Sequence, residues 1–256
     1  MEPAAAAAAV ARLDALTRRL RRECPWDREQ DERSIVPHTV EEAYELADAA
    51  NAGDDAKLLD ELGDVLFQVH FLSLLLEERG AGDLAAVAEH CRQKLIRRHP
   101  HVFADTEVAN AGEVLRNWDQ IKRGEPGRED GIFGDVPENL PALLHARKVQ
   151  RRAASSGFDS DGIPFDAVRG ELAELEAAAG DRDAAFDELG DVLFAAANVA
   201  RKLRVDPELA LRAASARFRG RVEAAEALAA RAGRAWGDLG PDDKLHFYAQ
   251  ARLHEA

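Results

Sequence analysis

The sequence predicts an all-α protein, and three observations support this fold class. Alanine, the strongest helix former, is abundant. Apolar residues recur at steps of three and four, whereas Val, Thr and the aromatic residues do not alternate in the period-two manner of strands. Gly and Pro are concentrated in a few places, which leaves long segments without a breaker. With 46% hydrophobic residues, the chain has the ordinary composition of a protein that buries cores.

Capping residues and breakers divide the first half into helices. Thr39 with Glu42 has the spacing of a capping box, so a helix is expected to begin near Val40, after a polar loop over Asp27–Pro37. Asp54 or Asp55 is expected to cap the next helix. The predicted helices of this half are Ala4–Glu23, about Val40–Asn51, Asp55 to near Gly80, Asp83–Arg98 and Glu113–Lys122.

The strongest composition break lies at Arg123–Pro137, which is rich in Gly and Pro. We therefore expect one domain over residues 1–123, a linker over 124–136 and a second domain over 137–256. The second half then repeats the plan of the first. Its predicted helices are Leu140–Ser155, Phe165–Ala179, Ala184–Leu203, Pro207–Ala232 and Pro241–Leu253.

The octapeptide DELGDVLF occurs twice, at Asp60–Phe67 and at Asp187–Phe194. Such an identity in a chain of 256 residues indicates an internal duplication. Each copy follows a helix that carries acidic residues: Glu41, Glu42 and Glu45 before the first, and Glu171 and Glu174 before the second. The duplication therefore predicts the same acidic unit in both halves.

The acidic residues are spaced for a metal site rather than for a solvated surface. Residues three or four apart share a helix face, so Glu42 pairs with Glu45 and Glu61 with Asp64. A short loop makes the two helices antiparallel neighbours, which brings the four carboxylates together. Carboxylates that close need a compensating charge, and all-oxygen ligands suit Mg²⁺ or Mn²⁺. The same ligands recur as Glu171, Glu174, Glu188 and Asp191.

Composition excludes several other functions. A net charge of −14 argues against binding to a nucleic-acid polymer. Cys24 and Cys91 form neither a disulfide framework nor a zinc pattern, and free thiols predict a cytoplasmic protein. The alanine run Ala4–Ala9 follows an acidic residue and leads into a helical pattern, so it is not expected to be a targeting peptide. No segment has the apolar length of a membrane span.

Cations and aromatic residues near the ends of the helices could hold a polyphosphate. Lys94 and Arg98 lie four apart on one helix, and Trp118 and Lys122 lie four apart on the next. The second half repeats the chemical types in the same order. There, the residues are Arg217, Arg221, Tyr248 and Arg252. We expect these cations to bind phosphates, and the aromatic residues to contact a base or sugar.

Taken together, these motifs resemble the MazG family of nucleoside triphosphate pyrophosphohydrolases over nearly the whole chain. The matching segments are Cys24–Asp27, Glu41–Glu45, Glu61–Asp64, Arg97–Phe103, Asn117–Lys122, Leu140–Leu144 and Gly157–Asp159.

The resemblance implies tandem MazG domains with four-helix-bundle sites, usually in a homodimer. It further implies Mg²⁺-dependent cleavage of nucleoside triphosphates to the monophosphate and pyrophosphate, which would clear aberrant or excess nucleotides. The implied metal ligands are the two sets of four carboxylates given above. Glu41, Glu45 and Glu61 are the expected catalytic residues, with Glu41 or Glu45 orienting or deprotonating the attacking water.

The two halves depart unequally from the family pattern. Gly170 stands where the family has the leading glutamate, Arg217 and Arg252 where Lys is usual, and Tyr248 where Trp is usual. By completeness of the motif, the first half is expected to retain a site, although the four core ligands are present in both halves. Two alternatives stay open: a narrower dNTP or phosphoribosyl-ATP pyrophosphatase, and a metal-stabilised regulatory module without turnover.

Overall fold

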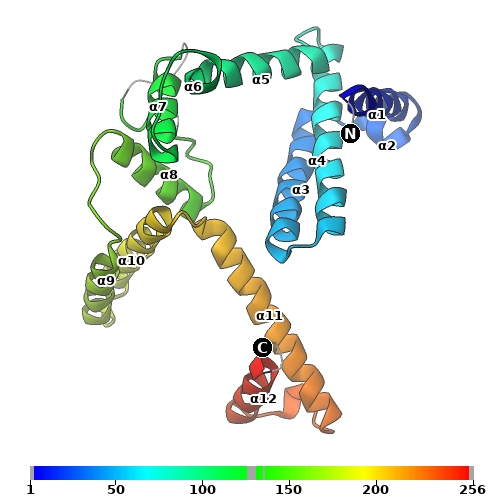
Figure 1. Cartoon of the computed structure of the whole chain (residues 1–256). Helices are drawn as coiled ribbons and strands as arrows, with labels where there is room; N and C mark the ends of the chain where they lie inside the picture. The colour runs from blue at the N-terminus through cyan, green and yellow to red at the C-terminus, as the bar shows by residue number, and fades with distance from the viewer. Residues whose placement is uncertain (1–2, 126–130, 135, 254–256) are drawn as a thin grey trace. The chain divides into compact units, whose positions relative to one another are not determined.

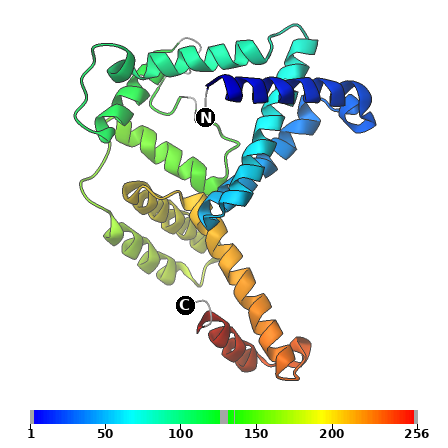
Figure 2. The same cartoon turned by 45° about the vertical axis from the view of Figure 1, so that its right-hand side comes forward.

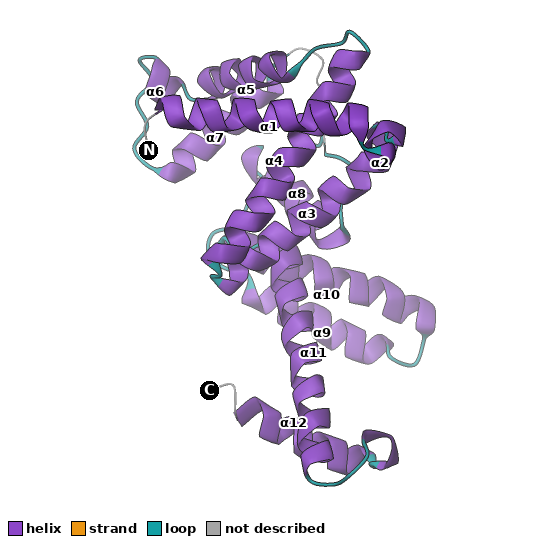
Figure 3. Cartoon of the chain, turned by 90° about the vertical axis from the view of Figure 1, so that its right-hand side faces the viewer, coloured by secondary structure: helices purple, strands orange, loops and turns teal. Residues whose placement is uncertain are grey.

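The computed structural model describes residues 3–125, 131–134 and 136–253, and all regular elements in these ranges are helices (Figure 3). The predicted all-α fold class is confirmed. None of the helices in these ranges combines the length and apolar character that a membrane crossing requires.

The chain divides into two compact units, Met1–Arg128 and Glu129–Ala256. We call them unit 1 and unit 2. The helices of unit 1 are α1 (Pro3–Glu23), α2 (Pro25–Glu29), α3 (Glu32–Ala52), α4 (Asp55–Glu78), α5 (Leu84–Arg98), α6 (Pro100–Phe103) and α7 (Ala111–Arg123). Those of unit 2 are α8 (Ala142–Ser155), α9 (Phe165–Ala178), α10 (Arg182–Leu203), α11 (Pro207–Arg231), the 3₁₀ turn η1 (Trp236–Asp238) and α12 (Pro241–Leu253).

Unit 1 is organised around the antiparallel pair α3–α4 (Figures 1 and 2). Gly53 ends α3 in the left-handed conformation, at φ 68°, where glycine has no steric penalty. Asp54 then caps α4, since its side chain accepts hydrogen bonds from the backbone N–H groups of Ala56 and Lys57. This short turn places the start of α4 beside the end of α3. α1 packs on α4, and α5 leads away from the C-terminal end of α4 to α6 and α7.

The predicted loop at Asp27–Pro37 is wrong. α2 begins at Pro25, and α3 begins at Glu32 with a capping box made by Asp31 and Ser34. Thr39, predicted as a cap, lies inside α3, where its hydroxyl donates to the carbonyl oxygen of Ile35. The helix runs through Pro37 because Ile35 is 1% exposed and packs with Phe71 and Leu75, and this burial offsets the missing backbone donor.

Unit 2 repeats the hairpin as α9–α10, and α8 packs on α10 as α1 packs on α4. Asp181 caps α10 with its side chain, as Asp54 caps α4. The core of unit 2 lies elsewhere, between α11, η1 and α12, where Leu239 and Phe247 pack on three buried alanines. The predicted helices of the second half agree with the observed ones to within two residues at each end.

Candidate metal centre

In unit 1, three of the predicted ligands come together between α3 and α4. One carboxylate oxygen from each of Glu42, Glu45 and Glu61 lies within 4.8 Å of the other two. Glu42 and Glu45 are one helical turn apart on α3, and Glu61 faces them from α4. Glu61 is buried, Glu42 is half-buried and Glu45 is exposed. The cluster is thus open to solvent on the side of Glu45.

The electrostatics of this cluster favour a bound cation. Burial raises the pKa of Glu61, Glu45 raises it further, and Lys57 opposes the shift from 3.9 Å away. The pKa of Glu42 is also raised, first by burial and then by the charges of Asp64 and Glu45. Carboxylates whose ionised forms are disfavoured in this way lower their energy by binding a divalent cation.

Unit 2 reproduces the cluster with Glu171 and Glu174 from α9 and Glu188 from α10. One carboxylate oxygen from each again lies within 4.8 Å of the other two. Burial raises the pKa of Glu188, and the charges of Glu174 and Asp191 add to the shift. The position of Lys57 is taken by Ala184 when the two octapeptides are aligned, so this cluster has no lysine on the same turn.

The donor set fits Mg²⁺ or Mn²⁺. All three side chains in each cluster are carboxylates, the hard oxygen ligands that these ions prefer over His or Cys sites. Three carboxylates also leave coordination positions for water or substrate phosphate, the usual arrangement for magnesium.

The remaining predicted ligands lie at the edge of the clusters. Asp64 and Asp191 are exposed and outside the sets of mutually close carboxylates, although the charge of each raises the pKa of a neighbouring glutamate. Glu41, a predicted catalytic residue, is also exposed, with its Oε2 3.2 Å from Nδ1 of His38. The roles assigned to these three residues stay predictions.

The predicted phosphate-binding residues of unit 1 gather at the far end of α5, away from the α3–α4 hairpin (Figure 1). Arg98 is buried there, and its guanidinium makes a paired contact with the carboxylate of Glu125. Trp118 of α7 lies beside it, with Cζ of Arg98 5.5 Å from the ring centroid. Lys94 and Lys122 come from the same helix pair. Within unit 1, these residues and the carboxylates therefore belong to separate helix pairs.

Unit 2 shows the same separation. Arg217 and Arg221 lie on α11, and Tyr248 and Arg252 on α12, which packs on α11. The ring of Tyr248 contacts Phe218 at a centroid distance of 5.8 Å. The acidic cluster lies on α9 and α10 instead.

Two residues of unit 1 were missed at the sequence level. Lys57 lies four residues before Glu61, a spacing that by itself indicates an ion pair between the two side chains. Glu125 lies in the segment assigned to the linker, and its pairing with Arg98 has no local sequence signal because the two come from different elements.

An all-α chain with two carboxylate clusters on helix hairpins has the features of a metal-dependent enzyme of phosphate chemistry. Residues 30–103 match the family model described as the MazG nucleotide pyrophosphohydrolase domain. A nucleoside triphosphate pyrophosphohydrolase of Escherichia coli strain K12 is 41% identical over 82% of this chain and 83% of its own length. A nucleoside triphosphate pyrophosphohydrolase/pyrophosphatase MazG of Thermotoga maritima is 39% identical over 88% of this chain and 87% of its own.

The chain belongs to the MazG family of nucleotide pyrophosphohydrolases. It is therefore a hydrolase that acts on phosphoric anhydride bonds.

Proposed function

We propose that the protein hydrolyses nucleoside and deoxynucleoside triphosphates to the monophosphate and pyrophosphate with Mg²⁺, and so removes aberrant or excess nucleotides. The observation that carries the proposal is the three-carboxylate cluster, formed once in each unit of a chain of this family. We further propose that unit 2 is a second MazG domain, because it repeats the octapeptide, the hairpin and the cluster.

The carboxylates have two parts in the proposed reaction, to hold the metal and to accept a proton. Glu42, Glu45 and Glu61, or Glu171, Glu174 and Glu188, would hold the metal with Asp64 or Asp191. A bound Mg²⁺ supplies Lewis-acid polarisation of the phosphate and lowers the pKa of a water molecule. Glu41 or Glu45 accepts the proton of the water that attacks the α phosphorus. Because the cations of α5 and α7, or of α11 and α12, lie on other helix pairs than the carboxylates of the same unit, they would balance the charge of the leaving pyrophosphate from a second copy of the chain.

We propose that the protein works as a homodimer. The accessible surface is 17409 Å². Two separate compact units, each half of the 28.0 kDa chain, would expose about 13,000 Å² in total. The difference is too large to depend on how the two units are placed. The extra accessible surface comes from helix faces within each unit that no other helix of that unit covers. A second copy of the chain would bury these faces.

The exposed apolar residues of the hairpins support this proposal. Leu62 and Leu66 of α4 are 50% and 41% exposed, and their counterparts in α10, Leu189 and Leu193, are each 47% exposed. These leucines recur at helical spacing in both units, as expected for a packed face. Light scattering after gel filtration should give about twice the mass of the chain, and a monomer at micromolar concentration would contradict the dimer.

The reaction is tested by product analysis. A panel of ribo- and deoxynucleoside triphosphates is incubated with the protein and MgCl₂, and products are separated by anion exchange. We expect monophosphate and pyrophosphate in equal amounts, and loss of both with EDTA. Diphosphate and orthophosphate would show cleavage at a different bond. Absence of turnover with every nucleotide would leave a metal-stabilised module as the better description, and turnover of a single nucleotide would indicate a narrower enzyme.

A further inference from the structure

The carboxylate of Glu125 lies among the cations at the far end of α5 in unit 1 (Figure 1). Glu125 stands in a bend two residues after the end of α7, and its side chain is 15% exposed. Its Oε1 accepts a hydrogen bond from Nε of Arg98 at 2.9 Å, and its Oε2 accepts one from Nη2 of the same guanidinium. Nη2 of Arg97 lies 3.9 Å from Oε1. Glu125 therefore offsets positive charge at the place where a phosphate is expected to bind.

The guanidinium of Arg98 is enclosed by its neighbours. Its side chain is 9% exposed, and its Cζ lies 5.5 Å from the ring centroid of Trp118. The imidazole of His99 packs edge-on against the same indole, at a centroid distance of 4.8 Å. Nδ1–H of His99 donates to the carbonyl oxygen of Leu95 at 2.6 Å, which fixes the imidazole. Trp118 thus covers one face of the guanidinium, and Glu125 takes its Nε–Nη2 edge.

A phosphate can make a paired contact with this edge only after the carboxylate of Glu125 has left it. Carboxylate and phosphate oxygens form the same two parallel hydrogen bonds with a guanidinium, so one can replace the other. The buried cation is never left without an anion in such an exchange, which avoids the large cost of an unpaired buried charge. Glu125 lies outside α7, so its release unwinds no helical turn.

The second half of the chain carries a glutamate at the corresponding place in the sequence. Glu125 follows Lys122 by three residues, and Glu255 follows Arg252 by three residues. The glutamate recurs although the cation and the aromatic residue that precede it differ between the halves. Glu255 lies outside the described residues, so this comparison is one of sequence. The recurrence indicates that the acid belongs to the cationic corner and not only to the turn after α7.

We propose that Glu125 is an internal competitor of phosphate: its carboxylate occupies Arg98 in the free protein, and a phosphate group of the nucleotide displaces it. The inference rests on the proposed function for the phosphate that Arg98 receives. Because the same contact is broken for every phosphate ligand, Glu125 lowers the affinity for substrate and for pyrophosphate by the same factor. A product that is held less tightly leaves sooner, so the competition favours turnover over product retention.

The test uses sodium pyrophosphate with EDTA, so that neither hydrolysis nor a metal takes part. Binding to the full chain is followed by NMR through the indole N–H resonance of Trp118, the aromatic neighbour of Arg98. The chain has three tryptophans, and the signal missing in Trp118→Phe identifies this resonance. Glu125→Gln removes the charge with little change in size. Glu107→Gln makes the same chemical change at an exposed position between α6 and α7 and is the matched control.

We expect Glu125→Gln to lower the dissociation constant of pyrophosphate by about tenfold or more, because less of the binding free energy is used to release Arg98. Glu107→Gln changes the net charge equally and should alter the constant by less than about twofold. In an Arg98→Ala background, Glu125→Gln should also have an effect below about twofold, since the competitor acts through Arg98. Circular dichroism confirms that each variant is folded, and if the Arg98→Ala variants are not, the two glutamine variants decide.

An unchanged or weaker affinity in Glu125→Gln would overturn the proposal, and so would a resonance of Trp118 that pyrophosphate does not move in any of the proteins. A merely structural role of Glu125 predicts the opposite sign, a loss of affinity. Tighter pyrophosphate binding by Glu125→Gln without hydrolysis of any triphosphate would support the competition and refute the proposed function. Triphosphate hydrolysis with pyrophosphate affinity unaffected by Glu125→Gln would do the reverse.

Discussion

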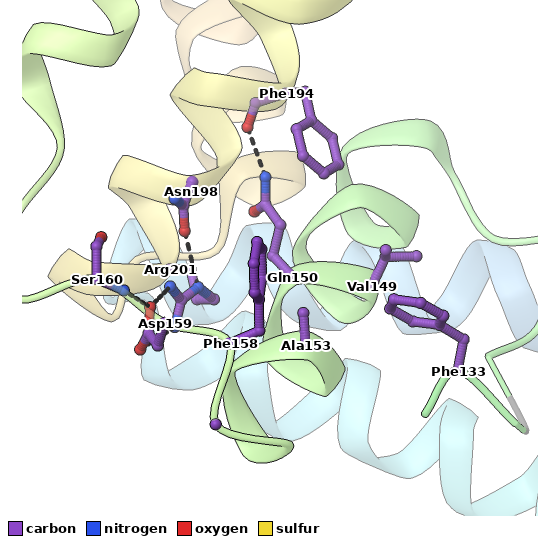
Figure 4. A pocket seen from close by; sticks show the side chains of 11 residues that line it. Phe133, Val149, Gln150, Ala153, Phe158, Asp159, Ser160, Phe194, Asn198 and Arg201 are labelled. Carbon is purple, nitrogen blue, oxygen red and sulfur yellow. Dashed lines mark hydrogen bonds and ion pairs between the residues drawn. The ribbon is translucent and has the colours of Figure 1, made fainter. Parts of the chain in front are cut away.

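The hairpins α3–α4 and α9–α10 share an identical octapeptide and the same cluster of three glutamates, yet their surroundings differ in charge and in packing. Lys57 lies beside Glu61 in the first, whereas Ala184 takes that place in the second. Phe71 is buried in the core that packs on the first hairpin, whereas Asn198 at the aligned position lines a cavity beside the second (Figure 4). The comparison teaches that a short repeated motif specifies a carboxylate cluster, while residues outside the motif set the charge and the packing around it.

The motif and the cavity give opposite expectations about which unit is active. Unit 1 retains Glu41, so its acidic motif is the more complete of the two. Unit 2 has Gly170 at the aligned position, an exposed glycine at which an added β-carbon would meet no atom within 4 Å. The second unit has a cavity of about 530 Å³ beside its hairpin, where the aligned position of unit 1 holds the buried Phe71. Because an open space beside the hairpin gives a nucleotide room to bind and to be positioned for attack, we expect the second unit to carry most of the activity.

The largest expected effect comes from removing one central carboxylate at a time. Glu188→Gln should lower kcat by about 100-fold or more, because a metal ligand contributes several kcal/mol to transition-state stabilisation. Glu61→Gln should leave most of the activity. Both are measured as pyrophosphate release under saturating nucleotide and MgCl₂.

Glu176→Gln makes the same chemical change at an exposed position of α9 outside the cluster and is the matched control. The reverse ranking of Glu188→Gln and Glu61→Gln would place the activity in unit 1 and favour completeness of the motif. Equal losses would mean that the two sites depend on each other.

A smaller effect is expected from removing the ion pairs of Asp159 in unit 2. Arg201, with Lys202, holds the pKa of Asp159 at about 2, below its ordinary value of 3.8. A carboxylate whose pKa is lower in the folded protein stabilises the fold at pH values above its ordinary pKa. This stabilisation is lost as the pH falls from about 4 to 2. Asp159→Asn should therefore destabilise unit 2 at pH 7 by about 1 kcal/mol and have little effect at pH 2.

Hydrogen exchange at the amides of α8 and α10 measures this difference, with the amides of α3 and α4 as the internal reference. Unit 1 has Leu74 and Leu75 in place of the two cations, so it cannot lose stability by this route. A destabilisation by Asp159→Asn that is the same at both pH values would show that the ion pairs are not its cause.

The smallest expected effect concerns Lys57. Lys57→Ala gives the first cluster the residue of the second and removes a cation that competes with the metal. The Lys57 side chain is 51% exposed, so the interaction is screened, and we expect the affinity of unit 1 for Mn²⁺ to rise about twofold to threefold. Titration of the Glu188→Gln variant, with and without Lys57→Ala, isolates this site. A lower affinity would mean that Lys57 supports the cluster instead of opposing it.

Most helices could be predicted because their signals are local. Asp54, Asp83 and Asp206 are capping residues just before apolar periodic segments, and each side chain accepts a hydrogen bond from the following backbone. The start of α3 could not be predicted in this way. Pro37 normally indicates a break, and the helix passes through it because Ile35 is buried against α4, which is a tertiary contact.

The same distinction holds for the candidate site. Glu42, Glu45 and Glu61 could be placed together from helical spacing and one short turn. The pairing of Arg98 with Glu125 and the buried Oε1 atom of Gln150, which accepts no hydrogen bond from the described residues, depend on contacts between elements, so no local pattern indicates them. The predicted boundaries of the two domains and the assigned roles of the site residues stay predictions.

The unequal cores of the two units also bear on local unfolding. In the described chain, α9 has no buried residue and α10 has one, Ala197, while the main core of unit 2 lies between α11 and α12. Elements with little buried apolar surface open at low free-energy cost. The α9–α10 hairpin should therefore be a separate cooperative unit that opens before the rest of the molecule. A nucleotide and metal bound to this hairpin would add their binding free energy to its closed state. The fraction of molecules with a closed hairpin would therefore rise with the nucleotide concentration.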